Sequence, residues 1–345
     1  MRVVVLHNAE EALASGAAQD ALAVVSVQAC ARAIAAALEA QGHHVETLAA
    51  PEQPAALLAA LERARPDALF NLVESYRGEA ALEPAVGALL ELSGVPFTGN
   101  RSLACALALR KPVAKALLAA AGVPVAEGVV VGGDAALDAA ADEAALAALA
   151  RRVAFPWIVK PAREDASHGI GAASVVDDVA AAHARARVVV ATYRQPALVE
   201  RFIAGRELNV ALIGPAAAPQ LLPIAEIDFA KFPAGRRRLV TYESKWVEGS
   251  PDWNGTNVVD ATLAPAVARR VEEVARAAWR TLEFSGYGRI DLRLDAHDEP
   301  VVLEANPNPD LSPDAGFARA WGRTGASYEQ LVARLLALAR PGPVA

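Results

Sequence analysis

Short β-branched runs alternate with longer alanine-rich stretches through the first hundred residues, and this alternation constrains the fold more than any other feature of the chain. Residues 2–7, 45–48 and 68–72 are predicted strands, and residues 21–41 and 55–65 are predicted helices. The run at 2–7 has no polar alternation, as expected for a strand that is buried on both faces. Strand–helix alternation with short turns predicts a parallel α/β layer.

The middle of the chain carries a different pattern, in which a polar loop interrupts the alternation. Helices are predicted at 111–121 and 135–152, and strands at 128–131 and 155–160. The stretch 162–171 that follows combines three charges, a serine, a histidine and two glycines. Such a loop lies either over a ligand or in an ordinary connection between strands.

The last part of the chain is rich in strands, and it ends its sheet with a hairpin. Strands are predicted at 207–213 and 221–227, and a helix at 263–284 precedes the hairpin strands 287–295 and 300–304. A long polar loop over 228–257 separates the two groups. A connection of that length inside a compact chain is usually a lid or a binding loop.

Charge and composition exclude several classes of function. The chain of 345 residues has a net charge of -7, and its largest basic cluster is the triplet at 236–238, so a nucleic-acid partner is not expected. Alanine tracts are broken by charges before they reach the roughly 18 apolar residues that span a bilayer. The amino terminus reads as a strand and not as a leader. Cys30 and Cys105 lie in apolar helical stretches, as reduced thiols do in the cytoplasm, where we expect this protein.

The final hairpin carries the most informative chemistry. Arg289 and Asp291 are two residues apart on one strand, and Glu304 and Asn306 are two apart on the next, so each pair shares a face of the sheet. Carboxylate and amide oxygens are the hard ligands that Mg²⁺ prefers. An Arg–Asp pair on a solvated hairpin is the plainer alternative. The rigid Asn-Pro-Asn-Pro turn at 306–309 favours a metal site.

Several segments together resemble one family. The hairpin sequence Tyr-Gly-Arg-Ile-Asp-Leu-Arg-Leu-Asp at 287–295, followed by Leu-Glu-Ala-Asn-Pro-Asn-Pro at 303–309, is similar to the metal-binding end of the ATP-grasp fold, and most similar to D-alanine–D-alanine ligases. Phe-Pro-Trp-Ile-Val-Lys-Pro at 155–161 and Leu-Val-Glu-Arg-Phe-Ile at 198–203 match the family in the same order. The resemblance begins near residue 68 and extends almost to the end of the chain.

The resemblance implies an α/β protein with an α+β C-terminal part. It predicts an N-terminal parallel α/β substrate domain over 1–100, a central ATP-grasp lid domain over 101–203 and a C-terminal ATP-grasp catalytic domain over 204–345. It implies a cytoplasmic, ADP-forming ligase that activates a carboxylate as an acyl phosphate and joins it to an amine. It also suggests a homodimer. Small-molecule carboxylate and amine substrates are the expected partners, without nucleic acid or membrane.

The family's functional residues map onto matching positions of this chain. By the resemblance, Asp291, Glu304 and Asn306 hold two Mg²⁺ ions, for which Mn²⁺ can substitute. Arg289 stabilises the tetrahedral oxyanion, and Lys245 contacts phosphate from the lid. The positions that bind ATP are Lys111, Lys160, Ser167, Glu200, Arg201, Phe202, Ile203 and Glu207.

The chain departs from the family where the first substrate binds. D-alanine ligases hold that substrate through a glutamate near the start of the first long helix, linked to a serine and to a lid tyrosine. Here residues 23–27 contain no glutamate, the serine position is Ala166, and the tyrosine position is Trp246. The turn at 71–76 also differs, and Asp310 replaces a usual glycine. The same reaction on different substrates is the simplest interpretation.

Three alternatives stay open from the sequence. The first is true D-alanine–D-alanine synthesis with a divergent pocket. The second is a non-catalytic ATP-grasp module that holds nucleotide without turnover, although Lys160, Asp291, Glu304 and Asn306 are all present. The third is an ATP-grasp enzyme that carboxylates its substrate with bicarbonate.

Overall fold

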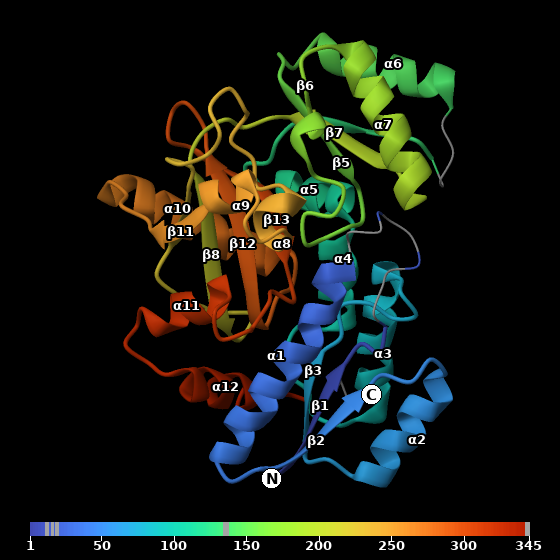
Figure 1. Ribbon diagram of the computed structural model, residues 1–345, viewed down its shortest axis with the longest axis vertical. Coiled ribbons are helices and arrows are strands. Elements are labelled where there is room, and N and C mark those ends of the chain that lie inside the picture. Colours follow the sequence, from blue (N-terminus) through green and yellow to red (C-terminus); the bar gives the residue numbers. More distant parts are fainter. Residues whose placement is uncertain (11–13, 15–16, 18–20, 134–137, 342–345) are drawn as a thin grey trace.

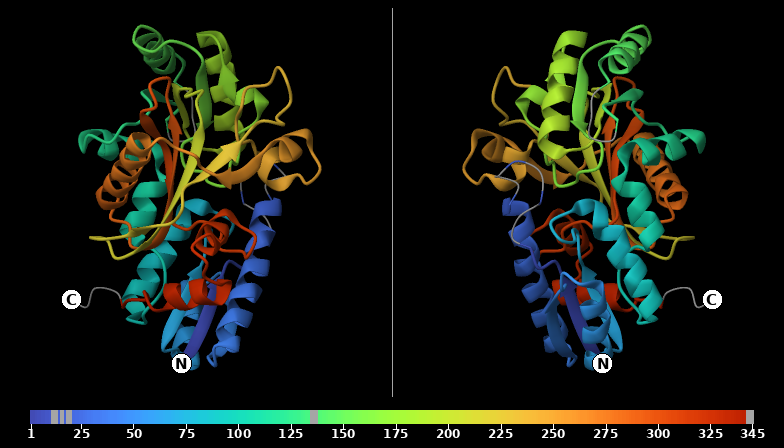
Figure 2. Two further views of the ribbon diagram at one scale, coloured as in Figure 1. Left: turned by 90° about the vertical axis from the view of Figure 1, so that its left-hand side faces the viewer. Right: turned by 90° about the vertical axis from the view of Figure 1, so that its right-hand side faces the viewer.

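The computed structural model of the protein describes residues 1–10, 14, 17, 21–133 and 138–341, without the side chains of residues 21–25 and 139. Three separate sheets, each with helices on at least one face, are stacked along the long axis of the molecule (Figure 1). The side views in Figure 2 show the amino-terminal sheet at one end and the helices of the second sheet at the other.

The first sheet is parallel, with strand order β2-β1-β3. Its strands are β1 (Arg2–His7), β2 (His44–Ala49) and β3 (Ala68–Leu72), and its helices are α1 (Ala21–Ala40), α2 (Pro54–Ala64) and α3 (Glu83–Ser93). Val3 and Val5 pack with α1, whereas Val4 and Leu6 belong to the cluster that includes residues of α2 and α3. Both faces of β1 are therefore buried, which explains its unbroken apolar sequence.

The second sheet is antiparallel, with strand order β4-β7-β5-β6. It comprises β4 (Gly128–Val131), β5 (Trp157–Pro161), β6 (Val175–Val176) and β7 (Ala197–Arg201), with α6 (Ala139–Ala150) and α7 (Val179–Tyr193). Trp157 and Val159 are buried against these two helices. Because side chains alternate along a strand, Lys160 of β5 projects from the opposite face.

The third sheet is also antiparallel, and its main path runs β11-β10-β8-β12-β13. Its strands are β8 (Glu207–Gly214), β9 (Gln220–Leu221), β10 (Ala225–Asp228), β11 (Asn257–Asp260), β12 (Gly286–Leu294) and β13 (Pro300–Asn306). Helices α4 (Ser102–Leu109), α5 (Lys111–Ala120) and α10 (Pro265–Thr281) share one core cluster with it. That cluster includes Val210, Ile290 and Leu292. The other face of β8, β12 and β13 carries polar side chains at one end, whereas Ala211, Ile213 and Tyr287 at the other end belong to the core cluster of the first sheet.

Two short helices occupy the segment 228–257, which the sequence predicted only as a polar loop. They are α8 (Tyr242–Trp246) and α9 (Pro251–Gly255). Thr241 caps α8 by accepting a hydrogen bond from the Ser244 N–H, and Ser250 caps α9 by accepting one from the Trp253 N–H. Each helix has five residues, too few for an apolar period to show in the sequence.

The last two described helices pack near the first sheet and its helix α1. Helices α11 (Gly316–Gly322) and α12 (Tyr328–Leu336) follow the last strand, and α12 packs on α1. Phe317 and Leu331 share a core cluster with Val3 and Ile34 of the first sheet and its helix.

The predicted α/β class, with an α+β C-terminal part, is confirmed by this arrangement. The predicted strand at 155–160 begins two residues later, at Trp157, and α4 was not predicted as a separate helix. The predicted helix at 135–152 starts in a part that is not described, and α6 is present from residue 139. The division at residues 100 and 203 stays a prediction. Along the described residues, no helix combines the length and the apolar character needed to cross a bilayer.

Candidate active site

The polar face of the third sheet forms the floor of the site. Asp291 of β12 lies directly opposite Glu304 of β13, and Arg289 lies opposite Asn306. The two predicted pairs therefore share one face, as strand alternation requires. On the other side of β12, Asn209 of β8 pairs with Asp291 in the strand register. The four residues that the sequence singled out in this hairpin are brought together.

Arg289 and Asp291 form a two-point ion pair. The Arg289 Nε donates to Asp291 Oδ1 at 2.7 Å, and an Nη donates to Oδ2 at 2.8 Å. The Asn209 amide also donates to Asp291 Oδ1, at 2.8 Å. Burial alone would lower the pKa of Arg289, but Asp291 and Glu304 raise it above its usual range. The guanidinium therefore stays charged at the bottom of the site.

Glu304 lies in a field of positive charge. Burial alone would raise the pKa of its carboxyl, but Lys111, Lys245, Lys160 and Arg289 lower it to about 2. These four cations come from α5, α8, β5 and β12, which are far apart in the sequence. The Glu304 carboxylate is thus held ionised by cations from these four elements.

Lys111 is the first residue of α5, and its side chain extends toward Glu304. Its side chain is only 3% exposed. The ammonium group lies 3.3 Å from Glu304 Oε2 and 3.2 Å from Asp165 Oδ1, and it also donates to the Glu164 carbonyl. Lys111 thereby links the floor of the site to the polar loop 162–171.

A second buried ion cluster lies on the inner face of the second sheet. Glu200 of β7 accepts Lys160 at 2.8 Å on one oxygen, and Lys115 lies 2.9 Å from the other oxygen. Burial would raise the pKa of Glu200, but the two lysines hold it below its usual range. Gly128 of β4 lies opposite Glu200, and a Cβ there would approach the Glu200 Cβ to 2.6 Å, so only glycine fits.

Arg293 fixes the segment that connects the second and third sheets. It is 1% exposed, and its Nε and Nη2 both donate to Glu207 Oε2, at 2.9 and 2.7 Å. Its Nη1 donates to the Ile203 carbonyl at 2.7 Å, and its Nη2 to the Arg238 carbonyl at 2.8 Å. The guanidinium also lies over the Phe202 ring, 5.0 Å from its centroid. One side chain thus joins β8, this connection and the segment that leads to α8.

The segment before β8 approaches β12 closely. Arg201 is exposed at the end of β7, whereas Ile203 is buried. A Cβ on Gly205 would lie 1.8 Å from the Leu294 carbonyl oxygen, and the Leu294 N–H donates to the Arg206 carbonyl at 2.9 Å. This tight contact fixes the backbone that directly follows the predicted adenine-binding residues 200–203.

The polar loop 162–171 lies against α8. The Trp246 indole N–H donates to the Ala166 carbonyl at 3.0 Å, and the Tyr242 N–H donates to the Ile170 carbonyl at 2.9 Å. Ser167 is half-buried in the same loop. In Figure 1, α8 and α9 lie near β13 and α5, on the side where this loop descends from β5.

The residues of the hairpin fit a magnesium nucleotide better than a bare cation. Within the described ranges, no three or more His, Cys, Asp and Glu side chains gather into a ready-made metal site. Asp291 and Glu304 supply two carboxylates, and Asn306 supplies an amide oxygen that already accepts the Asn308 N–H at 2.9 Å. Mg²⁺ characteristically takes one or two carboxylates and completes its shell with phosphate and water. The donor set therefore matches that ion.

Sequence reasoning missed several residues of this site. Arg293 lies two residues beyond Asp291, so the same alternation could have found it. Asn209, Lys115 and Asp165 could not be found in that way, because their partners depend on strand register and on the position of α5.

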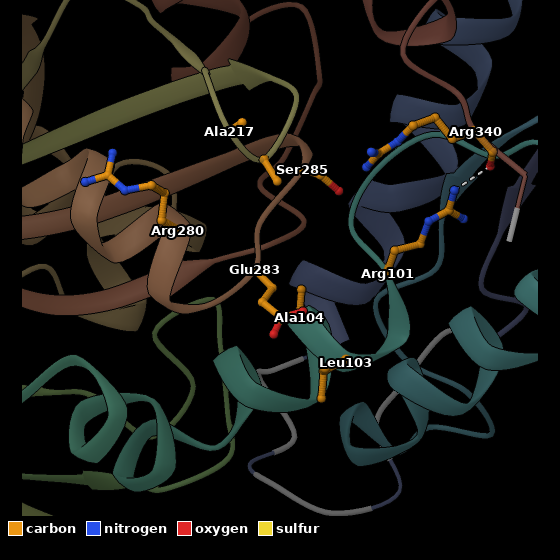
Figure 3. A pocket seen from close by; sticks show the side chains of 9 residues that line it. Arg101, Leu103, Ala104, Ala217, Arg280, Glu283, Ser285 and Arg340 are labelled. Atoms are coloured by element: carbon orange, nitrogen blue, oxygen red, sulfur yellow. Dashed lines mark hydrogen bonds between the residues drawn. The ribbon is translucent and has the colours of Figure 1, made fainter. Parts of the chain in front are cut away.

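A cavity of about 440 Å³ lies away from all of these residues (Figure 3). Arg101, Arg280 and Arg340 line it, together with Ser285 and the turn between β8 and β9. Arg101 donates to the Arg340 carbonyl at 2.6 Å, as the dashed line in Figure 3 marks. No predicted site residue borders this cavity.

Known proteins share both the sequence and the shape of this chain. A family model for the D-ala D-ala ligase C-terminus matches residues 117–337. A D-alanine–D-alanine ligase from Gluconobacter oxydans is 33% identical over 298 residues, covering 86% of this chain and 88% of that protein. This chain belongs to the D-alanine–D-alanine ligase family. An uncharacterized protein of Sinorhizobium fredii, y4sG, is 32% identical over 318 residues, covering 90% of this chain and 87% of that protein.

The D-alanine–D-alanine ligase family also accounts for the fold. The crystal structure of the Bacillus anthracis D-alanine–D-alanine ligase complexed with ATP matches with a TM-score of 0.71 and 17% identity, over 98% of this chain and 97% of that one. The predicted ATP-grasp fold is confirmed. As a member of this family, the chain is an ATP-dependent ligase that joins a carboxylate to an amine, as the sequence predicted.

Proposed function

We propose that this D-alanine–D-alanine ligase family member forms an amide or peptide bond by way of an acyl phosphate, and that its substrates are not two D-alanines. The carboxylate oxygen attacks the γ-phosphorus of ATP and ADP leaves. The amine then attacks the acyl carbon, and phosphate leaves. Glu304 lies opposite Asp291 in the strand register and 3.3 Å from the Lys111 ammonium, and this arrangement carries the proposed reaction.

The cations have separate tasks in this reaction. Lys160 and Lys111, both buried and both among the charges that lower the pKa of Glu304, would neutralise the phosphates of ATP. Arg289 lies on the floor beside Asp291, where a fixed positive charge would stabilise the tetrahedral oxyanion. Lys245, carried by α8, would contact the transferred phosphoryl group from above. Ser167 and the backbone of its loop would donate to the same group.

The remaining predicted residues would bind the rest of the nucleotide and its metal. Glu200 to Ile203 form the segment proposed to bind adenine, and Glu207 is proposed for the ribose hydroxyls. Asp291, Glu304 and Asn306 would hold two Mg²⁺ ions, replaceable by Mn²⁺. The ions would supply further neutralisation of the triphosphate. Glu207 supports this placement because Arg293 fixes its carboxylate beside Ile203.

The substrate pocket supports an acyl donor or acceptor other than D-alanine. Trp246 and Ala166 meet where the family's ligases have a tyrosine and a serine. Burial, with Asp310 and Asp165 nearby, raises the pKa of Glu74 to about 8 in the divergent turn at 71–76. True D-alanine–D-alanine synthesis is the second candidate, favoured by the 33% identity to the Gluconobacter oxydans ligase.

ADP release with pooled carboxylates and amines, followed by mass spectrometry of the product, tests the proposal. A product from a pair other than two D-alanines supports it. Efficient and exclusive D-alanyl-D-alanine formation would establish the second candidate instead. Glu304→Gln should lower turnover by at least about 100-fold, because it removes a charged ligand of the proposed Mg²⁺ ions. Glu299→Gln, at the exposed turn of the same hairpin, is the matched control and should keep wild-type rates.

The assembly and compartment follow from the same proposal. We infer a homodimer, supported by exposed apolar side chains on packed helices: Leu92 of α3 is 82% exposed and Leu103 of α4 is 51% exposed. Light scattering should give twice the mass of 35.9 kDa. The free, buried thiols of Cys30 and Cys105 support the cytoplasm as the compartment.

A further inference from the structure

Two consecutive residues of the loop 162–171 have a backbone conformation that side chains disfavour. Ala166 has φ of 53° and Ser167 has φ of 63°, both in the left-handed region. Residues other than glycine enter this region at an energetic cost, and neighbouring structure must hold them there. Contacts from other segments therefore determine whether the loop keeps this shape.

The contacts on either side of the strained pair are specific. Lys111 binds Asp165 at 3.2 Å just before the pair. From the other side, the Trp246 indole N–H donates to the Ala166 carbonyl at 3.0 Å, across 80 residues of sequence. The Tyr242 N–H donates to the Ile170 carbonyl at 2.9 Å. Helix α8 therefore contacts the loop at two places, Ala166 and Ile170. Trp246 is thus the side chain of α8 that hydrogen-bonds directly to the strained pair, Ala166 and Ser167.

The strained conformation leaves donors free for a ligand. In the part of the chain that the structure describes, the N–H groups of Ala166 and Ser167 have no hydrogen-bond partner. Consecutive N–H groups in a tight turn form a concavity that binds anions. The loop also lies beside Lys111, which reaches Glu304 at 3.3 Å. The free donors are therefore close to the proposed phosphate site.

We infer that Trp246 is a positioning residue that holds the loop 165–171 in its anion-binding conformation and so ties ATP cleavage to amide formation. This inference rests on the proposed function. When the indole contact is present, the loop and α8 close together over the acyl phosphate. When it is lost, water reaches the acyl carbon, phosphate leaves, and the carboxylate is regenerated. The net reaction is then hydrolysis of ATP without a product.

The variant Trp246→Phe removes the N–H donor and keeps an aromatic ring. We expect the KM for ATP to rise about fivefold, the value of one hydrogen bond. We also expect the number of ADP molecules released per amide formed to rise severalfold above the wild-type ratio. Trp253→Phe is the matched control, because Trp253 lies on α9 of the same lid and its side chain is 38% exposed. That variant should behave as wild type in both measurements.

Hydrogen exchange of the free protein separates this inference from the proposed function. In Trp246→Phe, the hydrogen-bonded loop amides of His168, Ile170 and Gly171 should exchange about fivefold faster than in wild type, whether or not substrates are known, since opening costs one hydrogen bond less. Trp253→Phe should leave those rates unchanged. Unaltered exchange rates in Trp246→Phe overturn the inference. An unaltered ratio of ADP released to amide formed, in an active enzyme, overturns it as well. Absence of any amide product from wild type, with faster exchange in the variant, would instead refute the proposed function alone.

Discussion

The replacement of Arg293 by methionine tests whether the buried ion pair with Glu207 holds the nucleotide side of the site together. Arg293 donates four hydrogen bonds, two to Glu207 Oε2 and one each to the Ile203 and Arg238 carbonyls. Methionine keeps most of the volume and removes all four donors. The Glu207 side chain, 10% exposed, is then left with a buried charge without this partner.

Removing one partner of a buried ion pair costs about 3–5 kcal/mol, because the remaining charge stays desolvated. We expect Arg293→Met to lower the free energy of unfolding by that amount. The double variant Arg293→Met with Glu207→Gln should recover about half of the loss, since the uncompensated charge is gone. Urea unfolding at pH 7, followed by circular dichroism, measures both differences.

Arg270 offers a matched control on the surface. Its Nε and Nη2 both donate to Glu299 Oε1, at 2.8 and 2.6 Å, as the same two nitrogens of Arg293 do to Glu207. The Arg270 and Glu299 side chains, however, are 42% and 40% exposed. Exposed pairs contribute at most about 1 kcal/mol, so Arg270→Met should cost no more than that. If the Arg293 and Arg270 variants lose equal stability, burial of the Arg293 pair is not what stabilises this connection.

Two further substitutions have expected outcomes. Because burial, Asp310 and Asp165 raise the pKa of Glu74 to about 8, the folded protein holds a proton that the unfolded chain releases near pH 4.5. The free energy of unfolding should therefore fall as the pH rises from about 4.5 to 8. Glu74→Gln should reduce this fall, as measured by urea unfolding at pH 5.5 and 8. An equal fall in wild type and variant would contradict the prediction. Gly205→Ala should cost at least about 2 kcal/mol in the same measurement, because its Cβ would lie 1.8 Å from the Leu294 oxygen. Gly316→Ala, with open space around the new Cβ, should be neutral, and similar losses in both variants would refute the steric argument.

Local sequence patterns predicted the regular elements well where packing and pattern agree. The strands β1 and β3 have the predicted bounds, because their apolar runs are buried on both faces. The segment 228–257 was predicted less well, since α8 and α9 depend on single capping hydroxyls and not on an apolar period. The late start of β5 has a similar origin: Pro156 has no N–H to donate to a neighbouring strand.

The site was predictable where one strand or one hairpin defines it. Arg289, Asp291 and Glu304 share a face because strand alternation is fixed by geometry. The interactions of Lys111 and Lys115 were not predictable from such patterns, because they depend on how α5 packs between two sheets. The hydrogen bond from the Trp246 indole to Ala166 joins segments 80 residues apart in the sequence, so no local pattern could predict it.

The packing of α12 on α1 has a consequence for how the chain is made. Phe317 and Leu331 fill the same core as Val3 and Ile34, although more than three hundred positions of sequence separate the first strand from Phe317. During synthesis the ribosome therefore releases the first sheet long before the residues that complete its interior exist. Until residues 316–336 have been made, that apolar face lacks its natural cover, and a nascent chain stalled before residue 316 presents it to chaperones.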